Sequence, residues 1–200
     1  QRPFFNFTYY PIEKIIDTEL NFSPDKKFIM IGHSGFPNGN HLDVISKIKN
    51  YQLGETQLII PFSYGVTKYI NEVKPLLLKV RSDIKFIEDF MPLEDYNKIL
   101  EGVKIAILNN RRQQAIGNII ALLYMGAKVF LSKKNTYYHF LKRNNIIVYC
   151  YEKDLNEKTI NMGLNFEEIE HNRKILFSLY NSKQLQSELQ NSVTKVIKND

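Results

Sequence analysis

The sequence has 200 residues, 44% of them hydrophobic, which suits a globular domain with its own core and excludes a disordered chain. Lysines and arginines number 27 against 21 acidic residues, so the formal charge of +6 favours an anionic partner: nucleic acid, a membrane surface or a phosphorylated ligand. The single cysteine, Cys150, excludes an internal disulfide framework and a cysteine-based zinc site, and no stretch approaches the roughly 20 apolar residues of a membrane span.

Residues 1–26 are predicted to be a linker or a packed arm. Aromatic residues crowd the first part of this stretch, beginning with Phe4 and Phe5, and a polar part follows. The chain starts with Gln1 and shows no signal-peptide pattern, so we expect it to be a piece of a longer protein.

From residue 27 to residue 154, short apolar runs alternate with segments of helical periodicity. Such alternation predicts a doubly wound parallel sheet with right-handed crossovers, a Rossmann-like α/β domain. The predicted strands cover residues 28–31, 57–61, 84–88, 104–108, a run ending at 131, and 146–149. The predicted helices begin near 41, cover 67–79, 93–100 and 136–143, and include one with an apolar face at Ile116, Ile119, Ile120 and Leu123. Residues 155–200 are predicted to be a helical tail, with helices over 156–162, 166–180 and 182–197.

A long loop with three glycines follows the first predicted strand. It runs from Gly32 to Asn40 and leads into the helix near His41. A strand, a glycine-bearing loop and a helix form the usual phosphate-binding arrangement, although this loop fits neither the Walker pattern nor the dinucleotide fingerprint. The loop after the second strand contains Ser63, Tyr64 and Gly65, for which simple turn chemistry is an alternative explanation.

The turn after the fourth strand is wholly polar and contains no acid. Two arginines and four amides follow one another there: Asn109, Asn110, Arg111, Arg112, Gln113 and Gln114. The first N–H groups of a helix lack internal partners and attract anions, and the planar guanidinium group can donate two parallel hydrogen bonds to a phosphate. We expect these residues to fill the turn and the first helical turn, with Gly117 one turn in, where a ligand or a neighbouring backbone can approach. The turn predicts a phosphate site; the alternative is a solvated turn before a core helix.

All of these polar loops follow strands. Because the carboxyl ends of parallel strands lie along one edge of a sheet, the loops can form a single composite site. The predicted cleft contains no convincing acid–base pair: His33 and His41 are candidates, but roles in the donor-binding loop are favoured for both, so the catalytic residues are not predicted. The histidines show no metal-ligand spacing, and neither a metal nor another cofactor is expected.

Several motifs together resemble the carboxyl-terminal, donor-binding half of GT-B glycosyltransferases, and more specifically glycosyltransferase family 56. The motifs are Gly32-His33-Ser34-Gly35 with Asn40-His41, Ile60-Pro61-Phe62-Ser63-Tyr64-Gly65, Tyr69-Ile70-Asn71-Glu72-Val73, and Arg112-Gln113-Gln114-Ala115-Ile116-Gly117-Asn118. The resemblance covers about residues 28–151. It implies transfer of a 4-acetamido-4,6-dideoxyhexose from a TDP-sugar (TDP-Fuc4NAc) to lipid II, an undecaprenyl-diphosphate-linked acceptor, in synthesis of a polysaccharide like enterobacterial common antigen.

The resemblance also implies partners and site residues. The partners would be the amino-terminal half of the same enzyme and the anionic, cytoplasmic face of the bacterial inner membrane, to which the protein would bind peripherally. The residues expected at the donor diphosphate are Gly32, His33, Ser34, Gly35, Asn40, Arg111, Arg112, Gln113, Gln114, Gly117 and Asn118. Those expected near the donor base or sugar are Ser63, Tyr64, Tyr69 and Phe90.

Two other functions compete with this hypothesis. The first is a non-catalytic α/β module that binds a nucleotide or a phosphate. The second is nucleic-acid binding, which predicts basic residues gathered in one stripe, whereas the lysines here are scattered through all segments. We therefore expect no nucleic-acid partner.

Overall fold

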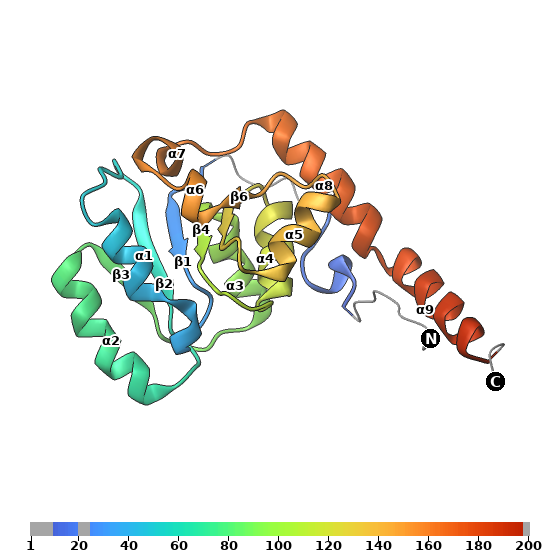
Figure 1. Cartoon of the computed structure of the whole chain (residues 1–200), viewed down its shortest axis with the longest axis horizontal. Coiled ribbons are helices and arrows are strands. Elements are labelled where there is room, and N and C mark those ends of the chain that lie inside the picture. The colour runs from blue at the N-terminus through green and yellow to red at the C-terminus, as the bar shows by residue number, and fades with distance from the viewer. Residues whose placement is uncertain (1–9, 20–24, 198–200) are drawn as a thin grey trace.

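The protein is described by a computed structural model, which covers residues 10–19 and 25–197. Within this part of the chain, a six-stranded parallel sheet lies between two layers of helices (Figure 1). The strands are β1 Phe28–Ile31, β2 Gln57–Pro61, β3 Ile84–Ile87, β4 Val103–Leu108, β5 Lys128–Leu131 and β6 Tyr149–Cys150. Their spatial order is β3-β2-β1-β4-β5-β6, so the prediction of a Rossmann-like parallel sheet is confirmed.

The helices cover both faces of the sheet. They are the 3-10 turns η1 Ile12–Lys14 and η2 Pro37–Gly39, and the α-helices α1 His41–Ile48, α2 Thr67–Val80, α3 Leu93–Glu101, α4 Ile116–Tyr124, α5 Thr136–Arg143, α6 Tyr151–Asp154, α7 Glu157–Asn161, α8 Phe166–Tyr180 and α9 Ser182–Ile197. One core cluster joins the sheet to α1, α2, α6 and α7, and the other joins it to α3, α4, α5 and α8. The alternating side chains of each strand supply both clusters, which explains why the strands are almost continuously apolar.

Helix α4 differs from its predicted form because it is buried all round. Every residue from Ile119 to Tyr124 is buried, and α8 packs on the side that faces away from the sheet. The prediction of one apolar face was therefore too narrow. The sequence did not indicate that α8 packs on α4 and buries its outer side. Helix α9 extends away from the body of the domain (Figure 1).

The sixth strand was also predicted in the wrong place. The expected run of 146–149 contributes only Tyr149 to β6, and Cys150 completes it. The reason is that the backbone of Ile147 exchanges two hydrogen bonds with the side chain of Asn172, which takes the place of a neighbouring strand. The apolar run is buried as predicted, but its first part pairs with α8.

The start of the described chain packs against both core and tail. Ile12 and Ile16 are buried in the cluster around α4, and the Glu13 carboxylate accepts hydrogen bonds from the backbone and hydroxyl of Ser182 at the start of α9. Most of the aromatic part of the predicted arm, residues 1–9, lies outside the described residues. The proposed domain boundaries at residues 26 and 154 stay predictions.

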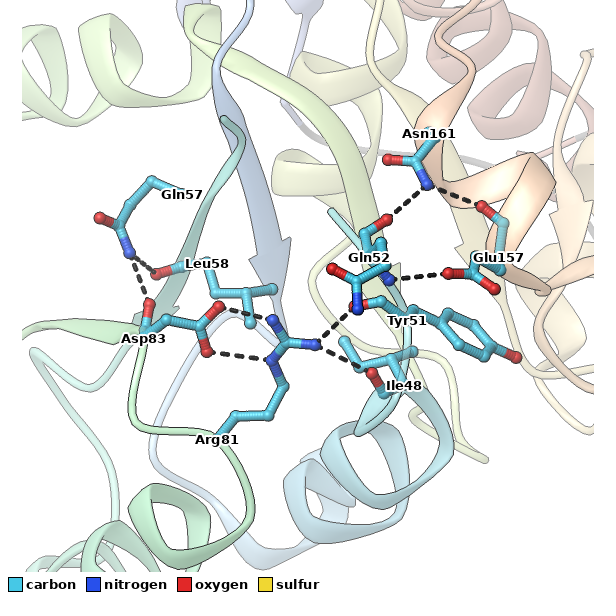
Figure 2. Close-up of polar contacts among 9 residues, drawn as sticks. All are labelled: Ile48, Tyr51, Gln52, Gln57, Leu58, Arg81, Asp83, Glu157 and Asn161. Carbon is cyan, nitrogen blue, oxygen red and sulfur yellow. Dashed lines mark hydrogen bonds and ion pairs between the residues drawn. The ribbon is translucent and has the colours of Figure 1, made fainter. Parts of the chain in front are cut away.

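At the amino ends of the strands, polar contacts join the end of α1 to the segment between α2 and β3 (Figure 2). The Arg81 guanidinium group donates hydrogen bonds to the backbone oxygens of Ile48 (3.1 Å) and Tyr51 (2.9 Å), and also pairs with both carboxylate oxygens of Asp83. This pairing is the main reason that the pKa of Asp83 is lowered. One side chain thereby joins the end of α1 to the segment between α2 and β3.

Candidate functional site

The strand order reverses between β1 and β4, whose following loops run in opposite directions across the sheet. In open α/β sheets this reversal leaves a crevice outside the carboxyl ends of the strands, where ligands bind. The two walls of the crevice are the loop of residues 32–40, called here the β1 loop, and residues 109–115, called here the β4 loop. Both contain residues predicted to bind a diphosphate.

The β1 loop is packed so closely that its glycines have no room for side chains. Gly32 has a φ of +69°, and a Cβ on it would lie 2.5 Å from Nε2 of His41. A Cβ on Gly39 would lie 2.5 Å from Cε1 of the same ring. The loop is thus folded around His41, the first residue of α1.

The second strand's loop is joined to the β1 loop at the site of another glycine. Gly35 donates a hydrogen bond from its backbone N–H to the oxygen of Tyr64 (2.7 Å), and its own oxygen accepts one from Val66 (3.0 Å). Gly65 has a φ of +143°, and a Cβ on it would lie 2.4 Å from the backbone of Gly35. Gly65 is therefore required by backbone contact between two loops, which goes beyond the simple turn that the sequence suggested.

Asparagine side chains join the two walls of the crevice. Asn40 Nδ2 donates to the backbone oxygen of Asn109 (2.7 Å), and Asn110 Nδ2 donates to that of Asn38 (3.2 Å). Asn110 Nδ2 also donates to Gln114 Oε1 at 2.7 Å. A carbonyl oxygen can only accept, so the Asn38 contact fixes the orientation of the Asn110 amide and leaves its Oδ1 atom facing elsewhere.

Four buried polar side-chain atoms near the crevice have no hydrogen-bond partner among the described residues: His33 Nδ1, Ser34 Oγ, His41 Nε2 and Asn110 Oδ1. Buried polar groups are normally paired, because each unpaired group costs on the order of 1–3 kcal/mol. Burial lowers the pKa of His33 to about 4, and burial together with the nearby His33 does the same for His41. Both imidazoles are therefore neutral at pH 7.

Helix α4 starts later than predicted and leaves its first N–H groups open. Ala115, the residue before it, has a left-handed φ of +55°, which a residue with a Cβ adopts at a cost of about 1 kcal/mol. The polar residues 109–114 therefore lie in the loop, and Gly117 is the second residue of the helix instead of one turn in. No side chain caps α4, and its first turn contains no acid.

The space beside Gly117, in the first turn of α4, is open. A Cβ built on this residue would meet no atom within 4 Å, so no described backbone lies close to it, and the approach of a ligand stays a prediction. Arg111, Arg112 and Gln113 are exposed and make no hydrogen bond or ion pair with any described residue. Gln114 is bonded to Asn110, and Asn118 is half-buried in the first turn of α4.

The residues predicted near the donor base or sugar are spread along the same edge. Ser63 and Tyr64 lie beside the β1 loop, where the Tyr64 ring makes an edge contact with Phe36 at 6.2 Å between centroids. The Tyr69 hydroxyl is already bonded to His41 Nδ1 (3.0 Å). Phe90 is 85% exposed in the loop after β3, two strands away from β1. The structure thus brings the diphosphate residues together and leaves Phe90 apart from them.

Sequence reasoning placed Asn110 in the polar turn and His41 in a family motif, but assigned neither a direct contact with the donor. The placement of His41 directly after the glycine loop was the available signal, whereas nothing in the sequence shows that one atom of Asn110 lacks a partner. In residues 10–19 and 25–197, no group of three or more histidine, cysteine or acidic side chains is arranged to hold a metal ion. In the same residues, no helix has the length and apolarity needed to cross a membrane.

Comparison with known proteins identifies one matching family. The family described as 4-alpha-L-fucosyltransferase glycosyl transferase group 56 matches residues 5–194, which is nearly the whole chain. The match includes both walls of the crevice as well as the C-terminal helices.

Solved structures share the fold at low sequence identity. AviGT4, a glycosyltransferase involved in avilamycin A biosynthesis, superposes with a TM-score of 0.63 at 10% identity, over 88% of this chain and 53% of that one. HepE of Anabaena, solved with UDP and glucose, gives 0.61 at 10% identity, over 86% and 49%. Sucrose-phosphate synthase of Thermosynechococcus elongatus gives 0.64 at 9% identity, over 96% and 50%. The chain spans about half the length of these proteins.

Proposed function

The chain belongs to glycosyltransferase family 56, and we propose that it is the donor-binding half of a GT-B glycosyltransferase. The half-length matches to the solved structures support a division of labour in which a second α/β domain completes the enzyme. In this proposal the present chain binds the nucleotide-activated sugar. The acceptor and the catalytic base belong to the amino-terminal half.

The observation that carries the proposal is the unfilled helix start at the crevice. The N–H groups at the start of α4, the open space at Gly117 and the unpaired guanidinium groups of Arg111 and Arg112 are all suited to an anion. A diphosphate supplies two adjacent anionic groups, so it can accept from the helix and from an arginine at once. The β1 loop forms the opposite wall, joined to the β4 loop by the side-chain amide of Asn40 and the backbone oxygen of Asn38.

The same groups would assist the reaction as well as binding. When the bond between the sugar and the diphosphate breaks, negative charge develops on the leaving diphosphate. Fixed N–H dipoles and guanidinium groups stabilise that charge more in the transition state than in the ground state, which accelerates the transfer. Arg111 and Arg112 are the residues of this chain to which we assign that role.

The finer assignment follows from the family resemblance. We propose TDP-Fuc4NAc as donor and an undecaprenyl-diphosphate-linked acceptor, with the enzyme bound peripherally at the cytoplasmic face of the inner membrane. The family's fucosyltransferase description supports a deoxyhexose donor, and the UDP and glucose bound to HepE belong to a protein of the same fold. Exposed Lys133 and Lys134 after β5 add cationic groups that favour an anionic lipid surface.

Calorimetric titration with TDP, UDP, GDP and thymidine tests the binding role. We expect TDP and UDP to bind more tightly than thymidine by at least tenfold, with TDP the tightest, because the crevice is built for the diphosphate. Arg143→Ala, which removes an exposed arginine at the end of α5, is the control and should leave the affinities unchanged. Equal affinities for TDP and thymidine would contradict a diphosphate site. Tight TDP binding by a full-length protein that transfers no sugar would favour the non-catalytic module.

A further inference from the structure

The imidazole of His41 is the packing centre of the β1 loop. It is fully buried at the first residue of α1, and the two glycines near the ends of the loop, Gly32 and Gly39, both lie against it. Phe62 at the end of β2 makes an edge contact with the ring at 5.0 Å between centroids. The shape of the loop therefore depends on where this ring lies.

One polar contact fixes the ring. His41 Nδ1 is 3.0 Å from the hydroxyl of Tyr69 on α2, and Nε2 has no hydrogen-bond partner among the described residues. Burial raises the pKa of the Tyr69 hydroxyl and lowers that of His41, so the two groups share a neutral hydrogen bond at pH 7. Phe62 and the glycines supply packing, and a hydrogen bond with the backbone of Ser34 partly offsets the lowering of the His41 pKa. Tyr69 is thus the side chain whose hydrogen bond holds the imidazole.

The effect of His41 reaches the other wall of the crevice. Asn40 directly precedes His41 in the chain and has a left-handed φ of +51°, and its side chain is the donor to Asn109 in the β4 loop. A change in the position of α1's first residue moves this amide as well. Two hydrogen bonds therefore connect the Tyr69 hydroxyl to the β4 loop: one to His41, and one from the preceding residue, Asn40, to Asn109. Tyr69 itself makes no hydrogen bond with Asn109 or with the described residues of α4.

We propose that Tyr69 is a positioning residue that acts through His41: their hydrogen bond holds the β1 loop in the shape in which it binds the donor diphosphate. This inference rests on the proposed function and replaces the role expected for Tyr69, a direct contact with the donor. When the Tyr69 hydroxyl donates its only hydrogen to His41 Nδ1, it has none left to donate to a phosphate oxygen.

Tyr69→Phe removes only the hydroxyl and tests the inference first without any ligand. In the wild type, nitrogen NMR should show His41 as a single neutral tautomer at pH 7. In Tyr69→Phe, we expect the tautomer populations to change and the backbone amides of Gly35 and Gly39 to exchange with solvent at least tenfold faster. Tyr51→Phe, which removes a half-buried hydroxyl near the other end of α1, is the matched control and should change neither signal.

The binding test uses TDP and thymidine as probes. We expect Tyr69→Phe to weaken TDP binding about tenfold and to leave thymidine binding unchanged, because the β1 loop faces the diphosphate and one neutral hydrogen bond is lost. His41→Phe keeps an aromatic ring but removes both nitrogens, and it should reproduce the loss.

The outcomes separate this inference from the proposed function. Unaltered exchange of Gly35 and Gly39 in a folded Tyr69→Phe variant would overturn the inference, as would faster exchange accompanied by wild-type TDP affinity. An equal loss of TDP and thymidine binding would also overturn it, since that result means a general structural role. Failure of the wild type to bind TDP would instead reject the proposed function, and the exchange experiment would still decide whether Tyr69 holds the loop.

Discussion

The two edges of the sheet use similar polar residues in opposite ways. At the amino edge, the Arg81 guanidinium group bonds to two backbone oxygens and a carboxylate (Figure 2). On the same edge, Lys26 donates to the backbone oxygens of Glu101 and Val103, and Lys128 donates to those of Thr159 and Met162. At the carboxyl edge, Arg111 and Arg112 make no hydrogen bond or ion pair with any described residue. The arginine of the amino edge therefore stabilises the fold, whereas the two arginines of the carboxyl edge keep their donors available.

This difference supports the proposed site. Buried polar atoms without partners are rare in folded proteins because they destabilise them. Among the described residues there are six, of which four, on His33, Ser34, His41 and Asn110, lie at the crevice, and the other two, on Tyr96 and Asn97, lie in α3. The opposite edge shows that this chain can pair its polar groups where only stability matters. In the proposed function, the donor supplies partners for the unpaired groups at the crevice.

Lowering the pH should have the largest effect on the free energy of unfolding, because two buried histidines lie at the carboxyl edge of the sheet. The pKa values of His33 and His41 are about 4 in the folded state against about 6.5 when unfolded, so the unfolded chain takes up protons first. Stability is complete above pH 6.5 and is lost as the pH falls toward 4, by roughly 2 kcal/mol for each histidine at pH 5. Urea unfolding at pH 7 and pH 5 measures this loss.

A single substitution tests the buried imidazole. His33→Asn should reduce the difference between the stabilities at the two pH values, because it removes one of the two histidines whose pKa is lowered by burial. An unchanged difference in His33→Asn would show that this imidazole is not buried in its neutral form.

Arg81→Ala tests the amino edge. We expect the free energy of unfolding to fall by about 3 kcal/mol, because the side chain is only 13% exposed and its removal leaves two backbone oxygens and Asp83 without their donor. TDP affinity of the folded variant should equal that of the wild type. Chemical denaturation and calorimetry measure the two quantities, and weakened TDP binding would contradict the separation of the edges.

Arg112→Ala combined with Gln113→Ala should have effects opposite to those of Arg81→Ala, with little change in stability and a large loss of TDP affinity. Both side chains are exposed and unpaired, so the free energy of unfolding should change by less than about 0.5 kcal/mol. Loss of a charged hydrogen bond to phosphate should weaken TDP binding about 30-fold. Wild-type affinity in the folded double variant would remove these residues from the site.

Gly117→Ala should reduce TDP affinity less than the double substitution does. A helical glycine with open space around it gains about 0.5–1 kcal/mol on replacement by alanine. The new methyl group projects into the space assigned to the diphosphate, so TDP affinity should fall severalfold. A stabilised variant with unchanged affinity would place the ligand elsewhere along the edge.

Much of the fold could be predicted because its signals are local. Helix α1 begins at His41, as expected, and the apolar runs of β1 and β2 give the predicted strands. The errors arose where a distant element intervened: α8 covers the outer side of α4, and Asn172 takes over the backbone of Ile147. Neither contact has a periodicity or spacing that the sequence reveals.

The site was predictable only in outline. Residue types and the strand–loop–helix pattern placed the arginines and the glycine loop at one edge, because that depends on the sheet being parallel. The close contact between Gly65 and Gly35, the left-handed Ala115 and the unpaired atom of Asn110 depend on how separate loops meet in space. No pattern within a single segment of the sequence indicates how these loops meet.

Mapping backbone amide chemical shifts during a TDP titration tests the central claim most directly. The account predicts that the largest changes occur at the start of α4, from Ile116 to Asn118, and in the β1 loop from Gly32 to Gly35. Arg81 and the other residues of the amino edge should not move. Shifts centred on the amino edge, or no saturable shifts at the start of α4 while TDP binds, would contradict the assignment of the crevice as the donor site.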